Sequence, residues 1–147
     1  IEDADVFIAA AAVADYRPAD PRDQKIKKSS ESMTIELVRC PDILASVAAL
    51  DPGPFTVGFA AETEKVDEYA QSKLEKKKLD MIIANRVGHD RGFDKDDNEV
   101  AVFWEQGERR FPKASKGELA NSLIELVTQR YYAARGEKNK DNVVAIH

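Results

Sequence analysis

The chain has 147 residues, a size that fits one domain with a sizeable core. Its hydrophobic share of 43% and charged share of 33% are typical of a globular protein somewhat rich in charge. The formal net charge of -5 argues against nucleic acid as the main partner. The single cysteine, Cys40, excludes an internal disulfide bond and fits a reducing compartment. With no apolar run of membrane-spanning length and no secretory signal, we expect a cytoplasmic protein without a membrane partner.

The first predicted element is a buried strand. The chain enters it almost at once and without a starting methionine, so we expect a part of a longer sequence. The run from Val6 to Val13 carries no charge, which predicts a strand covered on both faces, as in a parallel sheet. Its alanines are weak strand formers, and their small side chains would let a ligand approach the backbone. Asp15 follows where open α/β sheets place their ligand crevices. The alternative is tight helix packing on the alanines, followed by a solvated turn.

The next segment predicts a flap. Pro18 and Pro21 forbid regular structure there. The basic segment 25–28 and the alternating segment 34–38 are predicted to pair as a hairpin. A lysine cluster of this kind is also typical of a solvated edge strand protected against aggregation.

The remaining sequence alternates strands and helices. A helix is predicted from Pro41, in the first helical position, with Asp42 at the positive end of its dipole. The next elements are a strand at 55–60, a helix at 64–78 capped by Thr63, and a strand at 80–85. After a loop at 88–98 we expect a strand at 99–104, a turn at Gly107 and a return strand at 109–111. The last predicted element is a helix at 115–130 with a Ser115–Glu118 capping box. This order indicates an α/β fold: a three-layer, Rossmann-like, mostly parallel sheet with flap and dimerisation hairpins. We assign residues 1–132 to the domain and expect residues 133–147 to form a flexible tail.

Two lysines stand out in the predicted helix at 64–78. Successive steps of about 100° place the inner stripe on Val66, Ala70, Lys73 and Lys77, flanked by Tyr69 and Leu74. An ammonium group that faces a core is costly unless an anion meets it. A phosphate chain is a natural partner, because helices of α/β folds aim one end at the ligand crevice. The alternative is that both lysines extend past the core into water, near a helix C-terminus that favours them.

Several familiar site patterns are absent. The glycines have no G-x-G spacing, which disfavours a nicotinamide reductase, and there is no P-loop. Two histidines and one cysteine are too few to indicate a structural zinc site.

A set of short strings, in order, resembles phosphopantothenoylcysteine synthetase, the ligase domain often fused in bacteria to a flavin-dependent decarboxylase. The strings are AAVADYRP, KIKK, CPDILA, VGFAAET, KLEKKKLD, IIANRV and GFDKDDNEV, and the resemblance runs from about Asp5 to Tyr131. It implies a CTP-dependent enzyme of coenzyme A biosynthesis. The substrates would be CTP, 4'-phosphopantothenate and cysteine, joined through an acyl-cytidylate with help from Mg²⁺. FMN is expected only if a decarboxylase is fused upstream.

The resemblance also implies which residues form the site. The nucleotide-binding residues would be Ala9, Ala10, Ala11, Asp15, Lys25, Pro41, Asp42, Ile43, Leu44, Phe59, Lys73 and Lys77. Lys25 would also assist the chemistry, on a flap that tends to come from a neighbouring subunit, so a homodimer is implied. Fixed cations are the groups that such chemistry needs, since it brings an anionic carboxylate to an anionic phosphate.

Two departures from the family pattern bear on activity. The family usually has Asn before the Pro-Asp pair, where this chain has Cys40, a poorer helix cap. The family's upstream half, with a glycine-rich phosphate loop and an asparagine, is missing, so we expect this chain alone to be incomplete for ligation. A non-catalytic dimerisation or scaffold module is the alternative function.

Overall fold

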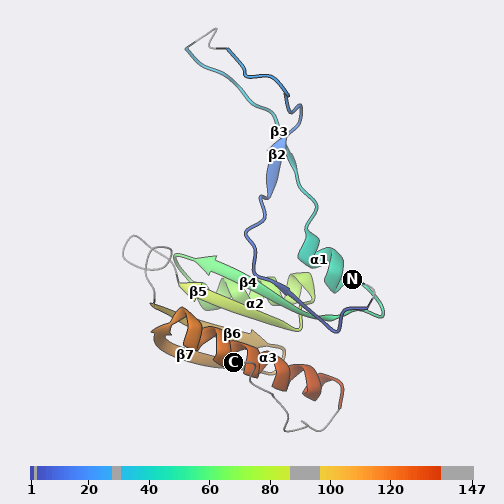
Figure 1. Cartoon of the computed structure of the whole chain (residues 1–147), viewed down its shortest axis with the longest axis vertical. Helices are drawn as coiled ribbons and strands as arrows, with labels where there is room; N and C mark the ends of the chain where they lie inside the picture. Colours follow the sequence, from blue (N-terminus) through green and yellow to red (C-terminus); the bar gives the residue numbers. More distant parts are fainter. Residues whose placement is uncertain (2, 28–30, 87–96, 137–147) are drawn as a thin grey trace.

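The structure is a computed structural model that describes residue 1 and residues 3–27, 31–86 and 97–136. Its elements are β1 (Val6–Ala9), β2 (Tyr16–Pro18), β3 (Leu37–Arg39), α1 (Ile43–Ala48), β4 (Phe55–Glu62), α2 (Val66–Lys77), β5 (Met81–Arg86), β6 (Asp97–Trp104), β7 (Gly107–Ser115) and α3 (Lys116–Ala134). Five strands form one sheet in the order β1-β4-β5-β6-β7, and β2 pairs with β3 apart from it (Figure 1).

The main sheet is mixed, with most strands pointing the same way. β4 lies parallel to β1 and to β5, whereas β6 is antiparallel to both of its neighbours. It follows that β7 runs in the same direction as β5 and that β6 alone opposes the other strands of this sheet. The predicted α/β class with a mostly parallel, Rossmann-like sheet is confirmed, and the β6–β7 hairpin extends the sheet.

Alternation along the central strands builds a core on each face of the sheet. On one face Val57, Ile83 and Val102 pack against the buried leucines of α3. On the other face Ile82 and Phe103 pack against α2, with α1 beside it. Helices therefore cover both faces, and the molecule has the predicted three layers (Figure 1).

A glycine in β4 permits close approach of α1 to the sheet. A Cβ atom at Gly58 would lie 2.8 Å from Leu44 Cδ2 and 2.9 Å from Leu79 Cδ1. No side chain fits there without a shift, so glycine allows the start of α1 to sit against the strand. This contact positions α1 near the carboxyl end of β4.

The prediction of a fully covered opening strand was wrong. β1 ends at Ala9, so residues 10–14 lie outside it. The strand is at an edge of the sheet and is only partly buried, with Ile8 38% exposed. An apolar run does not reveal whether a strand has a neighbour on each side, and here β1 pairs only with β4 among the described strands.

The flap prediction was right about a hairpin and wrong about its pairing. Residues 16–27 and 31–39 form an arm that projects from the sheet, and its antiparallel strands β2 and β3 lie at its base (Figure 1). The predicted partner segments 25–28 and 34–38 do not pair with each other where they are described. Instead, Leu37 and Val38 pair with β2, and the Glu36 C=O accepts a hydrogen bond from the Ala19 N–H. Lys28 lies outside the described residues. No second layer packs on this part of the arm, since Ile26, Met33 and Ile35 are each more than half exposed.

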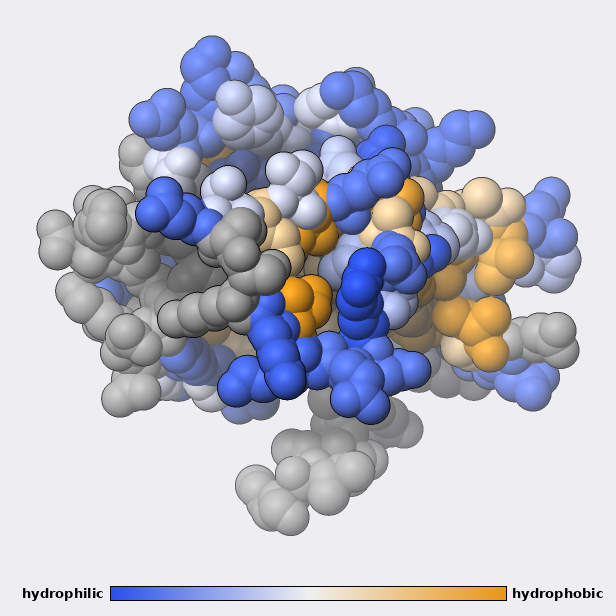
Figure 2. Space-filling model, turned by 90° about the horizontal axis from the view of Figure 1, so that it is seen from above, coloured by the Kyte–Doolittle hydropathy of each residue, from blue (hydrophilic) through white to orange (hydrophobic). Residues whose placement is uncertain are grey.

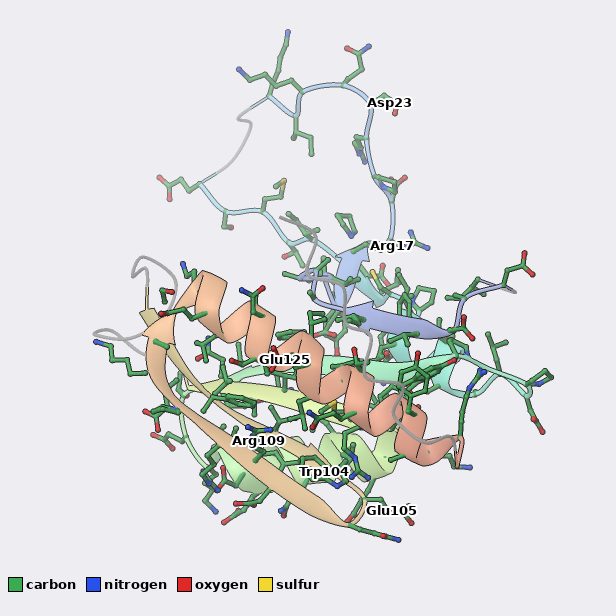
Figure 3. The ribbon with its side chains drawn as sticks, turned by 60° about the horizontal axis from the view of Figure 1, so that its bottom comes forward. Arg17, Asp23, Trp104, Glu105, Arg109 and Glu125 are labelled. Atoms are coloured by element: carbon green, nitrogen blue, oxygen red, sulfur yellow. The ribbon has the colours of Figure 1, made fainter. Side chains whose placement is uncertain are left out.

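Most of the described side chains of the arm are exposed to solvent. Figure 3 shows Arg17 at the base of the arm and Asp23 farther out along it. Seen from above, hydrophobic residues form separate groups among many hydrophilic ones (Figure 2).

Several predicted boundaries shift. α2 begins at Val66 after Lys65, which has a left-handed backbone and no side-chain cap, so Thr63 is not the cap. β7 is longer than the predicted return at 109–111. α3 has the predicted Ser115–Glu118 capping box and continues to Ala134, past the domain boundary placed at 132. The predicted loop at 88–98 lies mostly outside the described residues, and so does most of the tail.

Candidate nucleotide site

A cavity of about 510 Å³ lies where β1 ends, beside the start of α1 and the side of α2. The alanine run that follows β1 forms part of its lining. It is lined by Phe7, Ile8, Ala9, Ala10, Ala11, Ala12, Val13, Ala14, Asp15, Arg39, Cys40, Pro41, Asp42, Ile43, Leu44, Phe59, Lys73 and Lys77. This is the carboxyl edge of the parallel strands, where open α/β sheets bind ligands.

The structure brings almost all of the predicted site residues together at this cavity. They come from four separate parts of the chain: the end of β1 with the segment that follows it, the start of α1, β4 and α2. The predicted residues on it are Ala9, Ala10, Ala11, Asp15, Pro41, Asp42, Ile43, Leu44, Phe59, Lys73 and Lys77. Lys25 is not among the lining residues, because it lies on the arm.

Asp42 is the cap of α1. Its Oδ1 accepts a hydrogen bond of 3.0 Å from the backbone N–H of Ala45, and the helix itself starts at Ile43. The prediction that Pro41 takes the first helical position was therefore wrong. Cys40 lies two residues before the cap, so the departure from the family's asparagine does not weaken this helix start.

The two lysines flank the core face of α2 instead of forming it. Ala70 and Leu74 are the buried residues of the helix. Lys73 Nζ lies 2.6 Å from Glu62 Oε1, and Lys77 Nζ lies 2.7 Å from Asp42 Oδ2. The anions that meet these ammonium groups are thus carboxylates of the protein, and both lysines also line the cavity.

The charge of Asp42 is stabilised by its surroundings. Its hydrogen bond with Lys77 and that with the Ala45 N–H, with further attraction from Lys77 and Arg39, lower the pKa of the carboxyl below its ordinary value of 3.8. Asp42 therefore stays ionised and links α1 to α2 at the rim of the cavity.

Sequence reasoning missed two charged residues. Arg39 lines the cavity at the end of β3, and Glu62 holds Lys73 from the end of β4. Arg39 could have been suggested by its position just before a helix start. Glu62 had no signal, because its partner lies on the following helix and only the packing of that helix brings them together.

The carboxylates of the cavity limit where a metal ion could bind. Within the described ranges, no three histidine, cysteine or acidic side chains gather closely enough to hold one. Asp42 is engaged by Lys77 and Ala45, which leaves the exposed Asp15 as the other carboxylate lining the cavity. Mg²⁺ commonly binds through one or two carboxylates plus substrate phosphates, so Asp15 fits such a shared site.

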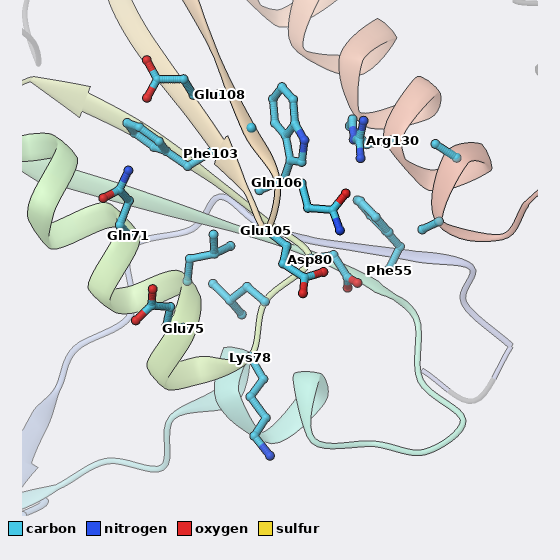
Figure 4. A pocket seen from close by; sticks show the side chains of 16 residues that line it. Phe55, Gln71, Glu75, Lys78, Asp80, Phe103, Glu105, Gln106, Glu108 and Arg130 are labelled. Atoms are coloured by element: carbon cyan, nitrogen blue, oxygen red, sulfur yellow. The ribbon is translucent and has the colours of Figure 1, made fainter.

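A second, larger cavity of about 990 Å³ lies at the starts of β4 and β5, around the β6–β7 turn (Figure 4). The Arg130 guanidinium lies 4.7 Å from the centre of a Trp104 ring there. Glu105, Glu108 and Asp80 make part of its lining acidic. None of the predicted site residues lines this cavity.

A family model described as "DNA/pantothenate metabolism flavoprotein C-terminal domain" matches residues 1–131. The chain belongs to this family. Curated proteins similar to this chain include coenzyme A biosynthesis bifunctional proteins named CoaBC. The Vibrio cholerae protein is 52% identical over 129 residues, which are 85% of this chain and 32% of that protein. The Escherichia coli K12 protein is 43% identical over 145 residues, which are 95% of this chain and 35% of that protein.

This chain thus spans about a third of the length of these relatives. Among solved structures, it resembles the C-terminal domain of a coenzyme A biosynthesis bifunctional protein CoaBC, with a TM-score of 0.68 and 31% identity. That match covers 92% of this chain and 58% of the solved chain. A DNA/pantothenate metabolism flavoprotein from Streptococcus pneumoniae has the same TM-score at 21% identity and supports the fold alone. Across the described part of this chain, no helix is both long and apolar enough to cross a membrane.

Proposed function

We propose that this chain is the nucleotide-binding portion of a CTP-dependent ligase of coenzyme A biosynthesis, which joins 4'-phosphopantothenate to cysteine. The observation that carries the proposal is the single cavity on which the end of β1, the start of α1, β4 and α2 converge. Arg39, Lys73 and Lys77 give this cavity three basic side chains. The kinship with coenzyme A biosynthesis proteins supports the substrate class.

The proposed reaction has two steps. A carboxylate oxygen of 4'-phosphopantothenate bonds to the α-phosphorus of CTP as the bond to the bridging oxygen breaks, which gives an acyl-cytidylate and pyrophosphate. The amine nitrogen of cysteine then bonds to the acyl carbon, CMP leaves with the electron pair of the broken C–O bond, and the amine loses a proton.

The basic side chains would offset repulsion between the anionic reactants. An ammonium group has three N–H donors, and each lysine uses one for its carboxylate partner. Lys73 and Lys77 can therefore keep these partners and still donate to phosphate oxygens. The alanine run offers a close approach to backbone, and Phe59 offers an apolar wall.

Mg²⁺ is part of the proposal, with Asp15 as the protein ligand beside the phosphates. When bound, the ion would neutralise charge on the leaving pyrophosphate. Lys25 would act from the arm, which we propose closes over the cavity of a neighbouring subunit in a homodimer. Such a cover would shield the acyl-cytidylate from water. FMN would belong to a decarboxylase fused upstream, outside this chain.

Substitution of the two lysines tests the proposal. We expect Lys73→Ala or Lys77→Ala to weaken CTP binding by about 10- to 100-fold, because each removes a charge-assisted hydrogen bond to phosphate. Lys76→Ala, on the exposed side of the same helix, is the control and should bind normally. Calorimetric titration of CTP measures all three variants.

Unchanged affinity in both lysine variants would overturn the proposal. If CTP fails to bind but the chain self-associates through the arm, the dimerisation or scaffold function is favoured instead.

A further inference from the structure

Glu62 is a charged residue that the proposed site does not use directly. It is the last residue of β4, and its side chain is 20% exposed. Its Oε1 accepts a hydrogen bond of 2.6 Å from Lys73 Nζ. Lys73 lines the cavity, whereas Glu62 does not.

The arrangement of charges around α2 explains why a carboxylate is useful there. Lys73 and Lys77 are four residues apart, so they are neighbours on the helix surface and repel each other. Each is met by a carboxylate from another element, Glu62 from β4 and Asp42 from the cap of α1. These contacts offset the repulsion and keep both ammonium groups directed along the same side of the helix.

The pair with Glu62 differs from an ordinary surface ion pair. Arg22 and Asp20 lie 3.8 Å apart on the arm, with side chains 68% and 84% exposed. In the Glu62 pair the contact is much shorter and the carboxylate is mostly buried, on a strand of the main sheet. A mostly buried carboxylate on a strand has few positions open to it, so it can fix the far end of a flexible lysine.

We propose that Glu62 is a positioning residue that holds Lys73 ready for the phosphates of the nucleotide. The proposal rests on the function proposed above. Glu62 engages one of the three ammonium donors and leaves the others for phosphate oxygens. Because the lysine is already ordered, less side-chain entropy is lost when the nucleotide binds.

A double-mutant cycle on the full-length protein that carries this chain tests this role. Glu62→Gln keeps the shape and the acceptor oxygen and removes the charge. We expect it to weaken CTP binding about three- to tenfold, the cost of ordering one lysine on binding. In a Lys73→Ala background, the same change should cause no further loss. Glu64→Gln, an exposed neighbour, is the matched control for removing one negative charge, and it should leave CTP affinity unchanged or slightly higher.

A second measurement does not depend on nucleotide. Acetic anhydride labelling, followed by mass spectrometry, reports the reactivity of Lys73 relative to the exposed Lys76. We expect Glu62→Gln to raise the labelling of Lys73 severalfold and Glu64→Gln to leave it unchanged. Equal labelling in the Glu62→Gln and unmodified proteins would overturn the proposal.

The two proposals can fail separately. If the unmodified protein does not bind CTP, the proposed function is wrong and the role of Glu62 falls with it. If it binds CTP and Glu62→Gln binds as tightly as Glu64→Gln, the positioning role alone is wrong. The same conclusion follows if Glu62→Gln costs as much with Lys73→Ala as without it.

Discussion

Asp42 joins three interactions in one side chain. It caps α1 through Ala45, pairs with Lys77, and lies close enough to Arg39 for their charges to attract. The sequence predicts that a helix starts beside Asp42, whose charge suits that end of the helix dipole. It cannot predict the pairing with Lys77, because that contact depends on how α1 and α2 pack.

The charge of Asp42 can be tested apart from its capping role. Asn caps helices about as well as Asp, so Asp42→Asn keeps the cap and loses the ion pair with Lys77. We expect it to lower the free energy of unfolding by about 0.5 kcal/mol at neutral pH, as for a partly exposed pair. Urea denaturation measures this difference.

The contribution of the Asp42 charge to the free energy of unfolding should depend on pH. The pKa of Asp42 is lowered by folding, so its stabilising charge is fully present above its ordinary value of 3.8 and is lost as the pH falls through the lowered pKa. The difference between the wild type and Asp42→Asn should therefore shrink progressively below about pH 4. A difference that stays constant down to acid pH would contradict this account.

At the scale of elements, a local signal was reliable where all the residues that form it lie close together in the sequence. The capping box of α3 joins Ser115 and Glu118, three residues apart, and it forms as predicted. The cap predicted for α2 failed, since the helix starts later, after Lys65. The lysines of α2 were placed on the inner stripe, yet packing turns the helix so that Ala70 and Leu74 face the core. A helical wheel leaves such a rotation open, and only contact with the sheet decides it.

The capping box gives a stability prediction. Ser115 Oγ accepts a hydrogen bond from the Glu118 N–H, and the Glu118 carboxylate accepts one from the Ser115 N–H. Ser115→Ala should cost about 1 kcal/mol in the free energy of unfolding. Ser122→Ala, inside the same helix, is the matched control and should be neutral or stabilising by up to about 0.5 kcal/mol. Equal effects in urea denaturation would show that the box does not stabilise α3.

At the scale of the molecule, the arm and the layered sheet are separate in their contacts. None of the buried core residues among those described lies in the segment 19–36. The cavity residues, by contrast, lie on β1 and β4 of the sheet, on the segment that follows β1, and around α1 and α2 on one of its faces. The cavity is therefore built on the same layered part of the chain as the core, whereas segment 19–36 has a part in the proposed chemistry without contributing a described residue to that core.

Shortening the arm tests this separation. Replacing residues 19–36 with a Gly-Ser turn should change the free energy of unfolding by no more than about 0.5 kcal/mol, since no core contact is lost. Under the proposed function, the same change in the full-length protein that carries this chain should abolish ligation and reduce dimerisation, measured by pyrophosphate release and sedimentation. Lys25→Ala in the intact arm is the comparison, and it should slow ligation while the dimer is kept. Normal ligation by the shortened protein would contradict a role for the arm.

The order of strands and helices, the α/β class and the capping box were predictable from the sequence, because each depends on residues close together in the chain. The same was true of the motifs that indicate the family. Tertiary structure alone decided that β1 lies at an edge, that β2 pairs with β3, and that Lys73 and Lys77 meet Glu62 and Asp42. These features depend on which surfaces meet when separate elements pack, and spacing along the chain does not carry that information.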